Sequence, residues 1–325
     1  MNNNHHNLKG IFMNNDDTIQ PEPSSVFHRV FVGYQGIRAG WSIGIFFIMM
    51  GLLTAAFVLP TQYLLEKNSL PVNEMQPIQT GVGELAVFLG LLGASMIMAF
   101  VEHRPLVSYG LEGTRRFVKF LYGVLSGAAA LSLLVGALYL FGFLVFDGQN
   151  MFGWKAIQYA FGWGAAFFLV GLYEEYLLRG YLQATLTRGI GFWWSALFLS
   201  VAFGCIHIFN KGESPVGICA AALVGIVFCV SLWYLKNLWW AIGFHASWNW
   251  SQSYLWGTAN SGNVAEGHLF SVHPQGNVFW SGGATGPEGS FIIIPLLLVI
   301  AMLMWIIWRK TSKQQTINDA DRILE

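Results

Sequence analysis

The chain has 325 residues, of which 54% are hydrophobic and only 10% are charged, whereas a soluble domain carries roughly 25% charged residues. This composition excludes an ordinary soluble globular protein and indicates a protein embedded in a membrane. The formal net charge is zero, so there is no excess of basic charge to favour nucleic-acid binding. Three cysteines, Cys205, Cys219 and Cys229, lie in apolar runs and are expected to pack rather than form disulfides.

The N-terminal region is polar. Residues 1–26 are rich in Asn and have no apolar stretch long enough for the core of a signal peptide, so we predict a disordered cytoplasmic tail. The adjacent His5 and His6 are expected to be solvated rather than metal-binding. Residues 27–39 mix aromatic side chains with one histidine and two arginines, which is typical of a short interfacial helix.

Eight apolar segments follow, each near the length of about 20 residues that crosses the hydrocarbon core. In chain order they are residues 41–62, 85–101, 117–144, 156–179, 192–209, 216–235, 238–255 and 291–308. The predicted fold class is therefore all-α, a polytopic membrane bundle of about eight transmembrane helices. Residues 256–290 are rich in Gly, Asn and Ser, and we expect them to run over the surface as a loop rather than form a soluble domain.

Basic residues are distributed unequally between the two ends of these segments. If both termini lie in the cytoplasm, 14 of the 17 Lys and Arg residues fall on the inner side, and only Lys67, Lys155 and Lys211 fall on the outer side. The positive-inside rule therefore favours a multi-pass protein with both termini in the cytoplasm. Residues 256–290 would then be extracytoplasmic.

Ionisable residues inside a membrane span are costly, so they are functional candidates by default. No Asp lies within a predicted span, which excludes an intramembrane aspartyl protease because that mechanism needs two Asp residues. Glu84 and Glu102 fall at span edges. The residues that remain well inside the spans are Glu174, Glu175, His207 and His245.

The two glutamates have different helical neighbours. Glu175 precedes Arg179 by four residues, the favourable order for a helical ion pair, so Arg179 is expected to neutralise Glu175. Glu174 lacks that partner and points about 100° away, so we expect the two carboxylates to occupy separate environments.

The two histidines also have partners at helical spacing. Phe203 shares a helix face with His207, and His245 shares one with Asn249. At a rise of 1.5 Å per residue, Glu174 and His207 both lie about 23–26 Å from the turn that joins their spans, so they are level. His245 lies only about 12 Å from the turn before its own span. The three groups can therefore meet only if the helices tilt or if the hairpin that joins the spans of Glu174 and His207 protrudes.

These groups suit hydrolysis. A carboxylate without its own cation can act as a general base on water beside an imidazole, which fits Glu174 with His207. The His245 imidazole and the Asn249 amide are spaced to donate to an oxyanion. The set Glu174, His207 and His245 would alternatively suit zinc with a metal-bound water as nucleophile, and residue types alone do not separate the two.

Other readings compete. Membrane histidines often hydrogen-bond between helices, and intramembrane carboxylates serve proton-coupled carriers. Glu175, Arg179 and Phe203 are expected to be structural at the site. The sequence contains neither H-E-x-x-H nor G-x-S-G, so no motif supports a zincin or a rhomboid-like serine protease.

Three motifs in this order on an eight-span chain resemble the CPBP family of intramembrane proteases, which comprises CAAX-protein endopeptidases of the Rce1 type and bacteriocin-processing or immunity proteins. The motifs are Glu174-Glu175-x-x-x-Arg179, Phe203-x-x-x-His207 and His245-x-x-x-Asn249. They lie within residues 156–255, and the stretch SGGATGPEGS before the last span is also similar to the family. Residues 1–80 show no such resemblance.

The resemblance implies an intramembrane endopeptidase in which Glu174 and His207 activate water and His245 and Asn249 hold the oxyanion. Such an enzyme would cleave a membrane-associated peptide of CAAX-like, leader or bacteriocin type near the cytoplasmic face. In the Rce1-type view glutamate acts without a metal, so we expect no required cofactor, with zinc as the alternative. The alternative function is a non-proteolytic immunity or scaffold protein.

The predicted organisation follows from these assignments. Its partners are a membrane-associated peptide or protein and the lipid bilayer of a bacterial plasma membrane. The expected divisions are a tail (1–26), N-terminal membrane segments with interfacial helices (27–115), a CPBP catalytic core (116–255), an extracytoplasmic Gly-rich loop (256–290), and the last span with a cytoplasmic tail (291–325).

Overall fold

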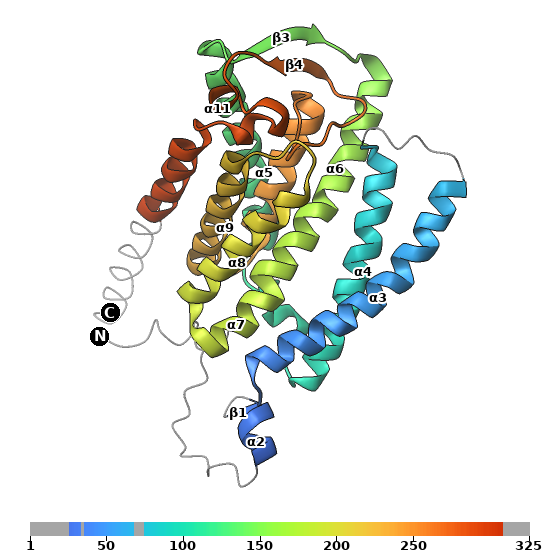
Figure 1. The fold of residues 1–325 in the computed structure, drawn as a ribbon, viewed down its shortest axis with the longest axis vertical. Coiled ribbons are helices and arrows are strands. Elements are labelled where there is room, and N and C mark those ends of the chain that lie inside the picture. Colours follow the sequence, from blue (N-terminus) through green and yellow to red (C-terminus); the bar gives the residue numbers. More distant parts are fainter. Residues whose placement is uncertain (1–25, 34–35, 68–74, 308–325) are drawn as a thin grey trace, which may run out of the picture.

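The computed structural model describes residues 26–33, 36–67 and 75–307. His5, His6 and nearly all of the predicted N-terminal tail lie outside these residues, as does the C-terminal tail. The described chain is a bundle of long helices, capped at one end by a two-stranded sheet and ending at the other in a short N-terminal helix (Figure 1). We call these the sheet end and the α2 end.

Six helical stretches in the described part of the chain are long and apolar enough to cross a membrane, which confirms the prediction of a polytopic helical membrane protein. They are α3 (Ala39–Lys67), α4 (Pro77–Val101), α5 (Arg116–Leu140), α6 with η2 and α7 (Gly153–Glu175, Tyr176–Leu182 and Gln183–Ile190), α8 with η3 (Phe192–Ile206 and His207–Phe209), and α9 (Pro215–Leu235). The other two predicted spans are shorter helices. They are α10 with η4 (Trp239–Trp250 and Ser251–Leu255) and the apolar helix Ile293–Ile307.

The N-terminal interfacial helix is shorter than predicted. Helix α2 (Val26–Phe31) stops before the two-residue strands β1 (Val32–Gly33) and β2 (Gly36–Ile37), which pair antiparallel. Gly36, in β2, has a φ of +91°, a left-handed conformation that favours glycine and does not fit within a continuous α-helix. The prediction of one helix across 27–39 is therefore wrong in its second half.

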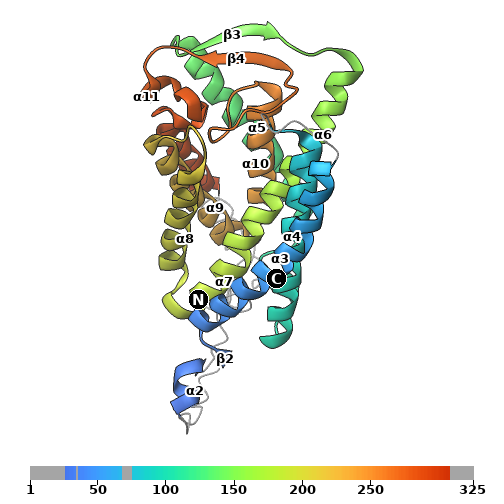
Figure 2. The ribbon, with the colours of Figure 1, turned by 45° about the vertical axis from the view of Figure 1, so that its right-hand side comes forward.

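The sheet at the other end was not predicted. Helix α5 ends at Leu140 rather than 144, and β3 (Leu144–Gln149) then pairs antiparallel with β4 (Phe270–Pro274). The segment 256–290 also contains α11 (Val278–Ser281) and the 3₁₀ turns η5 (Gly283–Thr285) and η6 (Pro287–Gly289). It caps the bundle (Figure 2), so the expectation of a loop that merely crosses the surface is wrong.

The hairpin that joins α7 to α8 protrudes past the hairpin that joins α9 to α10 at the α2 end. Leu238, in the turn between α9 and α10, donates its backbone N–H to the Gly110 carbonyl oxygen at 2.9 Å. The same leucine lies against Gly180, where an added Cβ would be 3.4 Å from Leu238 Cδ1. The α9–α10 turn is thus level with Gly180, eleven residues before Gly191 in the α7–α8 turn, and this offset explains the depth mismatch of His245.

Helices α5 and α10 approach each other closely through glycines. An added Cβ at Gly123 would overlap the Trp240 carbonyl oxygen, and one at Gly127 would overlap the Phe244 carbonyl oxygen. Gly243 of α10 is equally tight against Phe120 of α5. Small residues at such contacts let helix backbones pack directly, and α10 carries two of the candidate site residues.

Replacing Gly123 with alanine should therefore destabilise the protein by about 1–3 kcal/mol, because the methyl group must push α5 away from α10. Gly136→Ala on the same helix is the matched control, since a Cβ there meets nothing within 4 Å. The thermal unfolding midpoint in detergent should fall only for Gly123→Ala. Equal midpoints for the two variants would contradict the close packing.

Candidate active site

A cavity of about 310 Å³ lies among the helices and contains every residue predicted to be catalytic. Its walls come from α4, α6, α8, α9, α10 and the helix Ile293–Ile307, together with the segment 256–290. The predicted catalytic residues in its lining are Glu174, His207, His245 and Asn249. Residues from three separate predicted spans thus meet around one space.

The ion pair predicted within α6 and η2 is present. Arg179 Nη1 lies 3.1 Å from Glu175 Oε1, and both side chains are fully buried. The guanidinium carbon also lies 4.7 Å from the centre of the Phe203 ring and 5.5 Å from that of Phe228, distances at which the ring faces attract a cation. Phe203 therefore packs on the arginine as well as beside His207.

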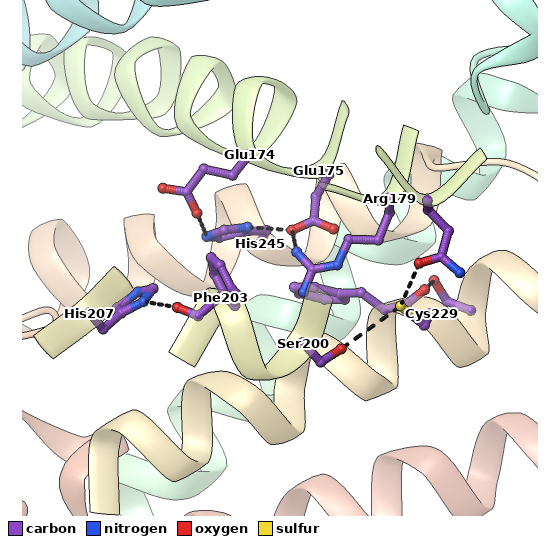
Figure 3. A network of polar contacts seen from close by, with 11 residues as sticks. Glu174, Glu175, Arg179, Ser200, Phe203, His207, Cys229 and His245 are labelled. Carbon is purple, nitrogen blue, oxygen red and sulfur yellow. Dashed lines mark hydrogen bonds and ion pairs between the residues drawn. The ribbon is translucent and has the colours of Figure 1, made fainter. Parts of the chain in front are cut away.

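One imidazole lies between the two glutamates (Figure 3). His245 Nδ1 donates to Glu175 Oε1 at 3.0 Å, while His245 Nε2 lies 3.6 Å from Glu174 Oε2. The two carboxylates differ in exposure as expected, because the Glu174 side chain is 30% exposed and that of Glu175 is fully buried. They share His245, however, so the expectation of separate environments is only half right.

The chain changes its helical form directly after the two glutamates. Residues Tyr176–Leu182 form the π-helical segment η2, and α7 then continues as a regular α-helix. A π-helical stretch inside an α-helix is rare and is found frequently at functional sites. The four-residue spacing predicted the partner of Glu175, but nothing in the sequence analysis indicated this wider turn.

His207 is held by its own helix. Its Nδ1 donates to the Phe203 carbonyl oxygen at 2.7 Å, and its ring meets the Phe203 ring edge-on, with centres 4.7 Å apart. Because Nδ1 is the donor in this bond, Nε2 is the nitrogen that remains for the cavity. The predicted pairing of Glu174 with His207 is replaced by the contact between Glu174 and His245, and His207 faces the same cavity from α8.

Another carboxylate, which was expected elsewhere, also lines the cavity. Glu84 was expected at a span edge, yet α4 begins at Pro77, so Glu84 lies about 10 Å inside that helix. The signal in the sequence was an ionisable residue in an otherwise apolar run. It was missed because the predicted span began at residue 85 rather than at Pro77.

Polar residues of the segment 256–290 also line the cavity. Asn260, Ser261, Asn263 and Glu288 all line it, and Glu288 accepts from the backbone N–H and, at 2.9 Å, from the hydroxyl of Ser261. Nearby, burial raises the pKa of Glu213; the Ser214 backbone N–H, at 2.8 Å, opposes this shift and the Glu288 carboxylate adds to it. The glycine-rich stretch before the last span thus contributes directly to the site.

The donor set does not fit the zinc alternative. Within residues 26–33, 36–67 and 75–307, no group of three or more His, Cys, Asp or Glu side chains is arranged to hold a metal ion. Glu174 and His245 lie together, but His207 is turned to Phe203 through Nδ1 and does not join them in such a group. We therefore derive no step through a metal.

Comparison with known proteins gives one match. Residues 156–251 match the family model described as Rce1-like, type II CAAX prenyl endopeptidase Rce1-like. This stretch begins in α6, ends in η4 and includes all seven residues of the three motifs. No curated protein and no solved structure matches the chain.

Proposed function

We propose, from the premise that residues 156–251 place this chain in the CPBP family with an Rce1-like core, that it is an intramembrane endopeptidase working by glutamate-activated water. The observation that supports this most strongly is the single cavity that brings Glu174 and His245 together with His207 and Asn249. A partly exposed carboxylate, two imidazoles and an amide donor at one space are the groups that peptide hydrolysis needs.

Glu174 is the proposed general base. It takes a proton from a water molecule, and the oxygen of that water attacks the carbonyl carbon of the scissile peptide bond. The proton then passes from Glu174 to the leaving nitrogen, the C–N bond breaks, and the carboxylate is restored. His207, whose Nε2 is left for the cavity, assists in orienting the water.

His245 and Asn249 are the proposed oxyanion donors. They lie one helical turn apart on α10 and both line the cavity. Glu175 fixes the imidazole through Nδ1, so Nε2 is held at Glu174. In this role the ring carries a proton on both nitrogens, because Nδ1 already donates to Glu175 and Nε2 must donate to the oxyanion. Once Glu174 has taken the proton from water its negative charge is gone, and the Nε2–H is left to donate to the oxyanion that forms at that moment. A donor that strengthens as charge develops favours the transition state over the bound substrate.

The test is a cleavage assay with purified protein in detergent and a library of membrane-anchored peptides, run with and without a chelator. We expect wild type to cleave a subset of the peptides, the chelator to have no effect, and Glu174→Gln to be inactive. Equal cleavage by Glu174→Gln would overturn the proposal. If the chelator abolishes wild-type cleavage and zinc restores it, a bound metal rather than Glu174 activates the water. No cleavage by either protein would favour a non-proteolytic immunity or scaffold protein.

A further inference from the structure

The candidate site lies nearer to one end of the bundle. The cavity takes Thr80 and Glu84 from the first turns of α4, His207 from the end of α8, and Gly217 from the start of α9. These helix ends all lie at the sheet end (Figures 1 and 2). The segment 256–290, which caps the same end, completes its lining with Asn260, Ser261, Asn263 and Glu288. The cavity therefore lies at the sheet end of the bundle.

The opposite half of the bundle is filled. Below Glu174 lies the buried pair Glu175 and Arg179, and below that a core of large side chains. The members of this core include Met98, Tyr109, Tyr176, Tyr181, Phe192 and Leu238, all 7% exposed or less. At the α2 end itself, Arg188 Nη2 forms an ion pair with Glu102 Oε1 at 2.8 Å. A polypeptide therefore cannot reach Glu174 from the α2 end without unpacking this core.

The charges of the described residues indicate which end faces the cytoplasm. Three basic residues, Lys67, Lys155 and Lys211, lie at the sheet end, whereas those at the α2 end are Arg29, Arg38, Arg104, Arg115, Arg116, Lys119, Arg188 and Lys236. The sheet end carries the acidic residues Asp147, Glu213, Glu266 and Glu288, and the α2 end carries Glu102 and Glu112. Because basic residues accumulate on the cytoplasmic side of membrane proteins, the α2 end faces the cytoplasm.

We infer that the cavity opens on the extracytoplasmic side, and that its substrate is the outer juxtamembrane segment of a membrane-anchored polypeptide. The substrate class rests on the proposed function, whereas the direction of opening does not. This inference reverses the sequence-based expectation of cleavage near the cytoplasmic face. It also removes a protein prenylated in the cytoplasm from the substrates that the site can reach directly.

The depth of the site sets how close to the membrane the scissile bond lies. Pro77, at the start of α4, lies beside Gly162 of α6, where an added Cβ would be 3.1 Å from Pro77 Cβ. Glu174 is twelve residues further along α6, or about 18 Å below the start of α4. An extended chain covers this distance with about five or six residues. The segment 256–290 contributes polar side chains such as Asn260 and Asn263 to the cavity, while the helices contribute apolar ones such as Phe167, Val224 and Leu297. A segment with a few apolar residues next to its anchor matches this lining.

The direction of opening is tested by thiol labelling in intact cells, with a small membrane-impermeant reagent, on single-cysteine variants of a chain in which Cys205, Cys219 and Cys229 are replaced by alanine. Gln275→Cys and Thr114→Cys are matched exposed positions at the sheet end and the α2 end, and Thr80→Cys lies in the cavity. We expect Gln275→Cys and Thr80→Cys to be labelled at once, and Thr114→Cys only after permeabilisation.

Two results would overturn the direction of opening: labelling of Thr114→Cys in intact cells, and a Thr80→Cys that reacts only after permeabilisation or not at all. Labelling needs no catalysis, so a failure of the proposed proteolysis would leave this result standing. The substrate class is tested with two reporters that share one anchor and carry the same segment on its outer or its inner side. Wild type should cleave only the outer reporter, and cleavage of the inner one would overturn the inference.

Discussion

Replacing Glu174 with glutamine should slow peptide cleavage by about 10²–10⁴-fold, the range that a positioned general base contributes. Glutamine keeps the shape of the side chain and its contact with His245 but cannot take a proton from water. The Glu174 side chain is 30% exposed, and its nearest ionic partner is His245 at 3.6 Å. The substitution therefore leaves no buried charge without a partner, and the unfolding midpoint should stay within a few degrees of wild type.

Glu84→Gln is the matched control for this experiment, because it removes a second carboxylate from the same cavity. If the loss in Glu174→Gln comes from the missing base, Glu84→Gln should lower the rate by less than tenfold. Initial rates under single-turnover conditions separate the chemical step from substrate binding. Similar losses in the two variants would show that cavity charge, rather than a base at Glu174, controls the rate.

Replacing Arg179 with methionine should destabilise the protein by about 3–5 kcal/mol, because the substitution leaves the buried Glu175 carboxylate without its cation. Both partners of this pair are fully buried and 3.1 Å apart. The methionine also gives up the contacts of the guanidinium with the Phe203 and Phe228 rings. We expect a large fall in the thermal midpoint in detergent and a reduced yield of monodisperse protein.

The double variant Glu175→Gln with Arg179→Met separates charge from packing. It removes both charges together and keeps an acceptor for His245 Nδ1, so it should recover most of the stability lost in the single variant. Equal instability of the single and double variants would contradict an electrostatic cause and assign the loss to packing of Arg179 against the rings.

The parts of the site that were predictable from sequence are those set within one helix. The pairing of Glu175 with Arg179 follows from a four-residue spacing, which the helix fixes regardless of the rest of the fold. The meeting of Glu174 with His245 depends instead on how closely α10 approaches α6. Gly171 permits that approach, since a Cβ there would lie 3.0 Å from the Ile242 carbonyl oxygen and 3.1 Å from the Ala246 nitrogen. The glycine was visible in the sequence, but its partner 71 residues later was not.

The cap of the bundle was missed for a related reason. Strands β3 and β4 are separated by more than 100 residues, and their pairing shifts register between Phe146 and Gly148, so no local pattern indicates it. The apolar run of α5 continues to residue 144 in the sequence, whereas the chain turns at Gly142, which has a φ of +76°. Hydrophobicity marks which residues avoid water, but it does not show where a helix gives way to a strand.

The π-helical segment Tyr176–Leu182 bears on which changes in chain length the site can accept. A wider turn accommodates an additional residue without changing the direction of the helix beyond it. Deleting one residue between Glu175 and Arg179 would therefore restore an α-helical turn and leave α7 in place, with the arginine three residues after the glutamate and still on the same helix face. A deletion within the regular helix α7 would instead rotate everything beyond it by about 100°. A change of one residue in length should therefore be accepted more readily during divergence within Tyr176–Leu182 than in the regular helices beside it.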